Sequence, residues 1–185
     1  MGFCNMKNFF LFPGILLVLL SGFAGFAKEC RIGYLSVDLP VDYSKPAVTR
    51  YDSSAKLVVG STPRENRSQS FISITEIYIN KYPEKTKENL LKLYPENEIA
   101  PFLAKKKVQY DAFSTTEIST QKLGGFKFVK VVWGGNLRGS DVKMRGIYLV
   151  ARDGDVIYEL NYVDYDDYFD LCYKEAMNIF NTLSH

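Results

Sequence analysis

The sequence predicts an α+β fold, with an antiparallel β-sheet flanked by helices and a long C-terminal helix. Residues 71–79 alternate between two sets of side chains and are rich in β-branched residues, which is typical of a strand. Several later apolar runs are joined by glycine-containing turns, as in an antiparallel meander. Beyond Val163, apolar residues recur in steps of three and four, which indicates one face of a helix.

The first part of the chain is predicted to form strands. Residues 32–40 are strand-like and end at Pro40, and a second short strand is expected over 56–60. The polar segment 61–70 has almost nothing to bury, so we expect an exposed loop there. The strand at 71–79 follows this loop.

Two helices are predicted next. A proline at the start and a glutamate in the first turn favour a helix over 83–94, and Pro95 is expected to end it. A second, short helix is predicted over 98–106, with an apolar side formed by Ile99, Phe102 and Leu103. The lysine run 105–107 is interpreted as a solvated helix end.

The second half of the chain is predicted to be mostly sheet. Gly124 and Gly125 separate two strand-like runs, which indicates a hairpin, and 134–140 is interpreted as a loop or hairpin tip. Asp153 and Gly154, between two apolar runs, form the clearest hairpin turn of the sequence. Together these turns predict a meander.

The acidic and aromatic stretch 162–172 is interpreted as the junction between the last strand and the C-terminal helix. Asp164 is the predicted N-cap, while Asp166 and Asp167 lie in the first turn, where negative charge is favourable. The spacing of these aspartates lacks the glycine bend and terminal glutamate of a calcium-binding EF-hand loop. The buried stripe of the helix is predicted to contain Tyr168, Phe169, Cys172, Ala176, Ile179, Phe180 and Leu183.

The first 27 residues have the order of a secretory signal peptide. Lys7 precedes an uncharged, largely apolar run, and small residues at positions 25 and 27 fit cleavage after Ala27. The alternative is that residues 9–27 remain as a membrane anchor, because the run is just long enough to cross a bilayer. We expect cleavage, a periplasmic or secreted protein, and a single α+β domain over 28–185.

The number of cysteines fits a periplasmic or secreted protein. Cleavage would remove Cys4 and leave Cys30 and Cys172, and an even pair in an exported protein predicts a disulfide. The alternative is two buried thiols.

Charge and residue types exclude several classes of function. Without Lys7 the basic residues fall from 23 to 22 against 21 acidic ones, so the mature chain carries a formal charge of +1 and has no general attraction to nucleic acid or anionic membranes. The only histidine is His185, the last residue, which disfavours a catalytic triad or a transition-metal site. The loop 134–140 matches no phosphate-binding motif. We therefore expect no catalytic residues, no metal and no cofactor.

Tyrosines are concentrated near the end of the chain, with five between 158 and 173. Some are expected to face solvent on alternating strand positions and to form a partner surface. The alternative is that they pack the sheet against the C-terminal helix. The candidate partner residues are Tyr158, Tyr162, Tyr165 and Arg138.

The order of these elements resembles the PsbP/Mog1-like superfamily, which includes the DcrB-like bacterial envelope proteins. The resemblance covers roughly 32–184 and rests on the opening strand YLSVDLP, the long strand FISITEI, the helix PEKTKENLLKLY, the strand KLGGFKFVKVVW, and the closing hairpin and helix that begin IYLVARDGDV. It implies an α/β/α sandwich and an accessory or binding protein without catalysis of its own. No functional residue is carried over, because no diagnostic motif is shared.

Two functions remain open from the sequence. The preferred hypothesis is an exported, non-enzymatic accessory protein of the bacterial envelope or secreted fraction that binds a protein partner through an exposed sheet face or loop. The alternative is a small-molecule carrier or hydrolase that uses a pocket between sheet and helix.

Overall fold

The computed structural model describes residues 27–63, 69–92, 95–116 and 118–185. The predicted signal peptide therefore lies outside the described residues, except for Ala27. In chain order the elements are β1 (Lys28–Arg31), β2 (Ser36–Leu39), β3 (Ala47–Tyr51), β4 (Ser54–Gly60), β5 (Phe71–Tyr78), a 3-10 turn (Ile79–Lys81), α1 (Glu84–Lys92), α2 (Pro95–Gln109), β6 (Tyr110–Thr115), β7 (Ser119–Leu123), β8 (Phe126–Leu137), β9 (Lys143–Asp153), β10 (Val156–Tyr165) and α3 (Asp166–Asn181).

The main sheet is antiparallel throughout and has the order β3-β4-β5-β10-β9-β8-β6, with β7 also paired to β8. The strands β7 to β10 form the predicted meander. Gly124 and Gly125 both have positive φ angles, as the predicted hairpin turn requires. Asp153 pairs with Val156, so the next hairpin turns at Gly154 and Asp155, one residue later than predicted.

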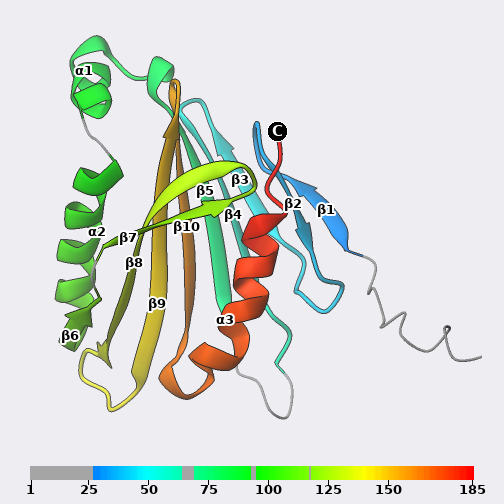
Figure 1. Ribbon diagram of the computed structural model, residues 1–185, viewed down its shortest axis with the longest axis vertical. Coiled ribbons are helices and arrows are strands. Elements are labelled where there is room, and N and C mark those ends of the chain that lie inside the picture. Colours follow the sequence, from blue (N-terminus) through cyan, green and yellow to red (C-terminus); the bar gives the residue numbers. More distant parts are fainter. Residues whose placement is uncertain (1–26, 64–68, 93–94, 117) are drawn as a thin grey trace, which may run out of the picture.

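Helices lie on both sides of this sheet, which confirms the predicted fold class (Figure 1). On β9, Ile147 and Leu149 pack in the core cluster beneath α3, whereas Tyr148 and Val150 pack in a second cluster beneath α2. This alternation follows from the two-residue period of a strand. The sheet is therefore the middle layer of an α/β/α sandwich.

The C-terminal helix α3 buries the predicted stripe. Phe169, Cys172, Ala176, Ile179 and Phe180 are all buried against the sheet. Tyr168 is only partly buried. Because buried apolar area stabilises a helix more than its local propensity does, this stripe accounts for the position of α3.

The predicted N-cap of α3 was wrong. Tyr165 is the cap residue and makes no side-chain capping bond, whereas Asp164 is the last buried position of β10. Its carboxylate accepts a hydrogen bond from the Tyr162 hydroxyl at 3.1 Å and one from the Tyr165 N–H at 2.8 Å. Tyr162 lies two residues earlier on the same face of β10. The Asp164 carboxylate therefore bonds the Tyr162 hydroxyl instead of capping the amide groups at the start of α3.

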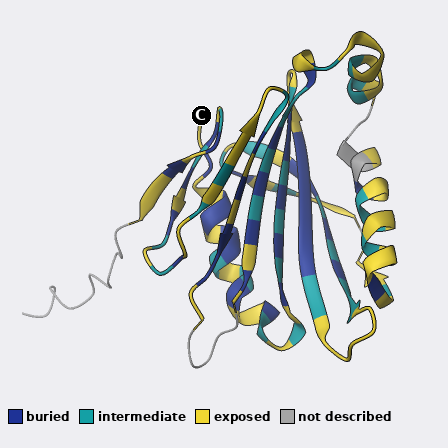
Figure 2. Ribbon diagram, turned by 180° about the vertical axis from the view of Figure 1, so that it is seen from behind, coloured by how far each residue is buried: buried dark blue, intermediate teal, exposed yellow. Residues whose placement is uncertain are grey.

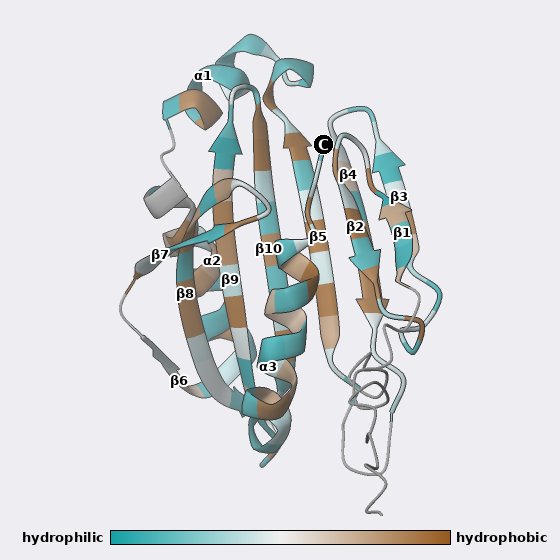
Figure 3. Ribbon diagram, turned by 45° about the vertical axis from the view of Figure 1, so that its right-hand side comes forward, coloured by the Kyte–Doolittle hydropathy of each residue, from teal (hydrophilic) through white to brown (hydrophobic). Residues whose placement is uncertain are grey.

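The predicted strand 32–40 was also only partly correct. Residues 28–31 and 36–39 form a separate two-stranded ribbon, which lies beside α3 and in front of the sheet (Figure 3). Within its turn, the N–H groups of Gly33, Tyr34 and Leu35 donate to the buried Glu76 carboxylate at 2.9–3.1 Å. A Cβ atom at Gly33 would lie only 2.7 Å from that carboxylate, so the turn requires glycine.

The helix α1 ends before Pro95, as predicted, and α2 is longer than predicted because it begins at Pro95 and ends at Gln109. The ring of Phe102 stacks on Tyr148 with centroids 3.9 Å apart, which fixes α2 over β9. Lys106 was expected in a solvated run, but its ammonium lies 4.8 Å from the centroid of the Trp133 ring, and burial lowers its pKa. None of the described helices combines the length and the hydropathy needed to span a membrane.

Candidate functional site

Helices of the described residues cover only half of the side of the sheet that carries α2. The second core cluster beneath α2 draws on β8, β9 and one residue of β10, whereas none of its buried residues comes from β3, β4 or β5. Seen from behind, the strands of this half have exposed and partly buried positions with no helix in front of them (Figure 2). We call the alternate residues that point outward from β3, β4, β5 and β10 the open face.

Cross-strand pairing arranges the open face in rows. Phe71 on β5 lies between Gly60 on β4 and Val163 on β10, and its side chain is 48% exposed. In the next row Val58, which is 38% exposed, pairs with Ser73, and Ser73 in turn pairs with Asn161. Charged side chains enter only in the third row, at Lys56 and Glu159, both of which pair with Thr75.

Sequence reasoning missed the open face, although its signal was present. The alternation in 71–79 places Phe71, Ser73 and Thr75 on one face of β5 and Ile72 and Ile74 on the other. The pattern distinguishes two faces but cannot show which half of a face lacks a helix.

The predicted tyrosine surface is corrected by the burial of two of its members. Tyr158 and Tyr162 are 1% and 0% exposed and belong to the core beneath α3, so they cannot contact a partner in this fold. Tyr165 is 45% exposed at the end of β10, and Arg138 is exposed beyond β8, where it pairs with Asp111. Contact of these two residues with a partner stays a prediction.

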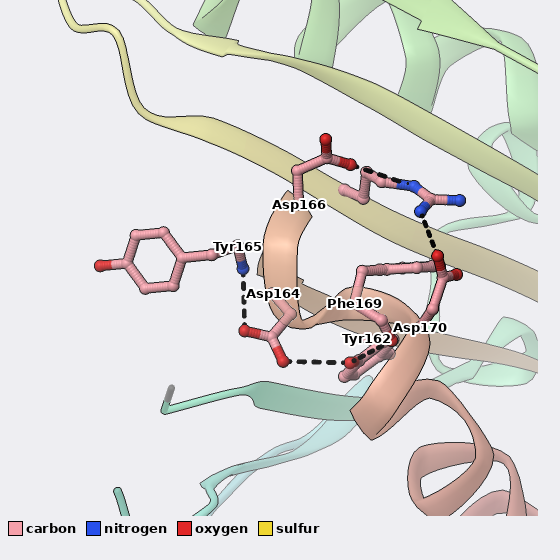
Figure 4. Close-up of polar contacts among 7 residues, drawn as sticks. Tyr162, Asp164, Tyr165, Asp166, Phe169 and Asp170 are labelled. Atoms are coloured by element: carbon pink, nitrogen blue, oxygen red, sulfur yellow. Dashed lines mark hydrogen bonds and ion pairs between the residues drawn. The ribbon is translucent and has the colours of Figure 1, made fainter. Parts of the chain in front are cut away.

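The acidic residues at the start of α3 bind an arginine (Figure 4). Arg145 on β9 forms ion pairs with Asp166 at 3.4 Å and with Asp170 at 3.0 Å, and its guanidinium lies 4.3 Å from the centroid of the Phe169 ring. Among the described residues, no three His, Cys, Asp or Glu side chains are grouped as metal ligands. These two acids therefore hold α3 to β9.

A hollow of about 360 Å³ lies next to this arginine, between the sheet and the start of α3. Its lining comes from β6, β8, β9 and α3. Gly134 lies on its floor, and a Cβ atom there would make only ordinary contacts, 3.6 Å from Arg145 Cγ and 3.8 Å from Ser114 Oγ. The hollow has the location of the pocket in the alternative hypothesis, but Asp166 is its only lining carboxylate.

Both remaining cysteines are buried thiols, and no bond joins them. The structure therefore shows the alternative arrangement of two buried thiols and does not contain the predicted disulfide, whose formation stays a prediction.

Comparison with known proteins adds information at the level of the fold. No family model matches the sequence, and no curated protein matches it. Among solved structures, the solution structure of cyanobacterial PsbP from Synechocystis aligns with a TM-score of 0.59 and 8% identity, over 88% of this chain and 95% of that one. The fold is of the PsbP/Mog1-like type.

Two further structures share this PsbP/Mog1-like fold. LpqN of Mycobacterium tuberculosis, described as involved in cell envelope biogenesis, aligns with a TM-score of 0.51 and 13% identity over 89% of this chain and 88% of that one. PA94 of Pseudomonas aeruginosa, a protein of unknown function described as a putative regulator, aligns with a TM-score of 0.51 and 9% identity over 87% and 98%. The family resemblance inferred from the order of elements is thus confirmed as a resemblance of fold.

Proposed function

We propose that this chain is an extracytoplasmic, non-enzymatic accessory protein that binds a partner protein through the open face. The observation that carries the proposal is the exposed apolar pair Phe71 and Val58, beside the partly buried Val163, on the half of the sheet that no described helix covers. An antiparallel sheet with one solvated face normally presents polar side chains there, so a phenylalanine at 48% exposure is informative.

The composition of the open face favours a protein partner. The centres of protein interfaces are enriched in aromatic residues and depleted of charge, with polar residues at the rim. Phe71 and Val58 lie beside serine and asparagine, and the charged pair of Lys56 and Glu159 is displaced by one further row. The signal-like N-terminal segment and the envelope-related description of LpqN support a location outside the cytoplasm.

The proposal can be tested by a pair of matched substitutions. Phe71→Asp places a charge at the centre of the open face, whereas Leu171→Asp places one at an apolar residue of α3 that is 71% exposed on the other side of the molecule. We expect a photo-reactive residue at position 58 to crosslink saturably to one envelope protein. Phe71→Asp should abolish that crosslink, and Leu171→Asp should preserve it.

Two results would contradict the proposal. One is loss of the crosslink in both variants to the same extent, which would indicate a general effect of charge. The other is retention of the crosslink in Phe71→Asp when its circular dichroism spectrum and its urea midpoint match those of the unmodified protein.

A further inference from the structure

The hollow beside the start of α3 is lined by several hydrogen-bond donors that have no partner in the described part of the chain. Ser114 from β6, Asn136 from β8 and Lys143 from β9 all line it, and no described residue forms a hydrogen bond or ion pair with their side chains. These groups supply a hydroxyl, an amide and an ammonium. They approach the same space from three neighbouring strands.

The carboxylate that lines the hollow is already paired. Asp166 is the only carboxylate there, and it is paired with Arg145, which also bonds Asp170. Arg145 is therefore balanced by these two carboxylates, and Lys143 is the charged lining group without a partner among the described residues. The amide groups at the N-terminus of α3 lie at this end as well and add a favourable dipole for negative charge.

We infer that this hollow binds a phosphate group, as inorganic phosphate or as a small phosphate ester. Donors from three strands suit a tetrahedral anion, which accepts bonds in several directions, better than a planar carboxylate, which favours a bidentate fork. A volume of about 360 Å³ also leaves space for an organic group attached to the phosphate. The inference goes beyond the proposed function and does not depend on the open face.

The floor of the hollow provides a way to block it without changing its charge. Gly134 lies opposite Ser114 on β6 and Arg145 on β9, and its Cβ position is free of close contacts. A larger side chain at this position would occupy the space between the donors. Gly134→Val should therefore exclude the ligand while every charged group remains.

The test is an NMR titration of residues 28–185 at constant ionic strength, with inorganic phosphate, sn-glycerol 3-phosphate and, as the neutral control, glycerol. We expect saturable shifts of the amides near Ser114, Asn136 and Lys143 with both phosphates and none with glycerol. Lys143→Gln should weaken binding by at least about tenfold, because it removes a charge-assisted hydrogen bond. Lys56→Gln, an exposed strand lysine on the open face, should leave the affinity unchanged.

Several outcomes would overturn the inference. These are the absence of saturation up to about 10 mM phosphate, equal losses in Lys143→Gln and Lys56→Gln, and equal binding of glycerol and its phosphate. If Gly134→Val fails to fold, the comparison of Lys143→Gln with Lys56→Gln still tests whether the hollow binds phosphate. Sedimentation with phosphatidylglycerol vesicles that depends on Lys143 would support the inference and assign the phosphate to a lipid headgroup, whereas binding of the soluble ester alone would support it and assign a free metabolite.

Discussion

The two faces of the sheet are built from the same strands but are covered very differently. One face is closed by α3, by the β1–β2 ribbon and by the residues that follow α3, where Ser184 pairs with Ser36. On the other face α2 packs over β8 and β9, and no helix in the described part of the chain covers β3, β4 and β5 in the same way. The difference separates positions that fold the protein from positions that are free to bind.

The side chains follow this division. The closed face presents aliphatic and aromatic residues in one continuous core cluster. The open face presents hydroxyl and amide groups around Phe71 and Val58. Residues of the same type should therefore contribute unequally to stability according to the face they occupy.

The largest expected difference is between two phenylalanines. Phe180→Ala removes a fully buried ring from the closed face and should lower the free energy of unfolding by about 3–5 kcal/mol. Phe71→Ala on the open face should cost less than about 1 kcal/mol. Urea denaturation followed by circular dichroism measures both values. Equal losses would mean that the open face is closed by contacts absent from this structure.

The next effect concerns the carboxylate that attaches the ribbon to the closed face. Glu76→Ala would leave the three N–H groups of the ribbon turn and the Tyr78 hydroxyl without their acceptor, at a cost of about 2–3 kcal/mol. Glu159→Ala is the matched control on the opposite face, because among the described residues Glu159 accepts a hydrogen bond from the Tyr148 hydroxyl alone. Amide hydrogen exchange should accelerate at Gly33–Leu35 in the first variant only.

Alkaline unfolding gives a third effect, to which buried tyrosines of the closed face contribute. Burial, with the nearby carboxylates Glu76 and Asp153, raises the pKa of Tyr158 to about 12, and burial next to Asp164 raises the pKa of Tyr162. Unfolded tyrosine loses its proton near pH 10, while the folded protein retains it. The stabilisation is therefore complete below about pH 10 and is lost as the pH rises toward 12.

Urea midpoints measured from pH 8 to 12 test this dependence. The midpoint should fall above about pH 10, and Tyr158→Phe should reduce the slope of that fall. An unchanged slope in this variant would show that other groups cause the alkaline loss.

Local sequence patterns predicted the elements that are determined by residues close together in the sequence. The meander follows from turn residues such as Gly124 and Gly154, and α3 follows from a stripe with helical spacing. The ribbon could not be predicted in this way, because Glu76 binds backbone groups 41 to 43 residues away. Asp164 was misassigned for a related reason. In the sequence, an aspartate before a helix is compatible with a capping role or with a buried strand position, and only the bond from the Tyr162 hydroxyl to its carboxylate distinguishes the two.

The candidate sites were less predictable than the fold. Strand alternation identified two faces, but the tyrosines chosen for a partner surface, Tyr158 and Tyr162, occupy the closed one. The hollow depends on the convergence of Ser114, Asn136 and Lys143, which are separated in sequence and meet only through strand pairing. A single sequence does not contain that pairing.

The smallest effect is expected at the edge of the closed face, where Arg145 bonds Asp166 and Asp170. These side chains are 34%, 40% and 81% exposed, so solvent screens both ion pairs. Arg145→Gln should lower the free energy of unfolding by about 0–1 kcal/mol, and the difference should shrink in 0.5 M salt, which shortens the screening length to about 4 Å. A larger loss that persists in salt would show that Arg145 stabilises the fold mainly by stacking its guanidinium on Phe169, 4.3 Å from the ring centroid. The stabilising contacts of the closed face would then reach as far as the edge of the hollow.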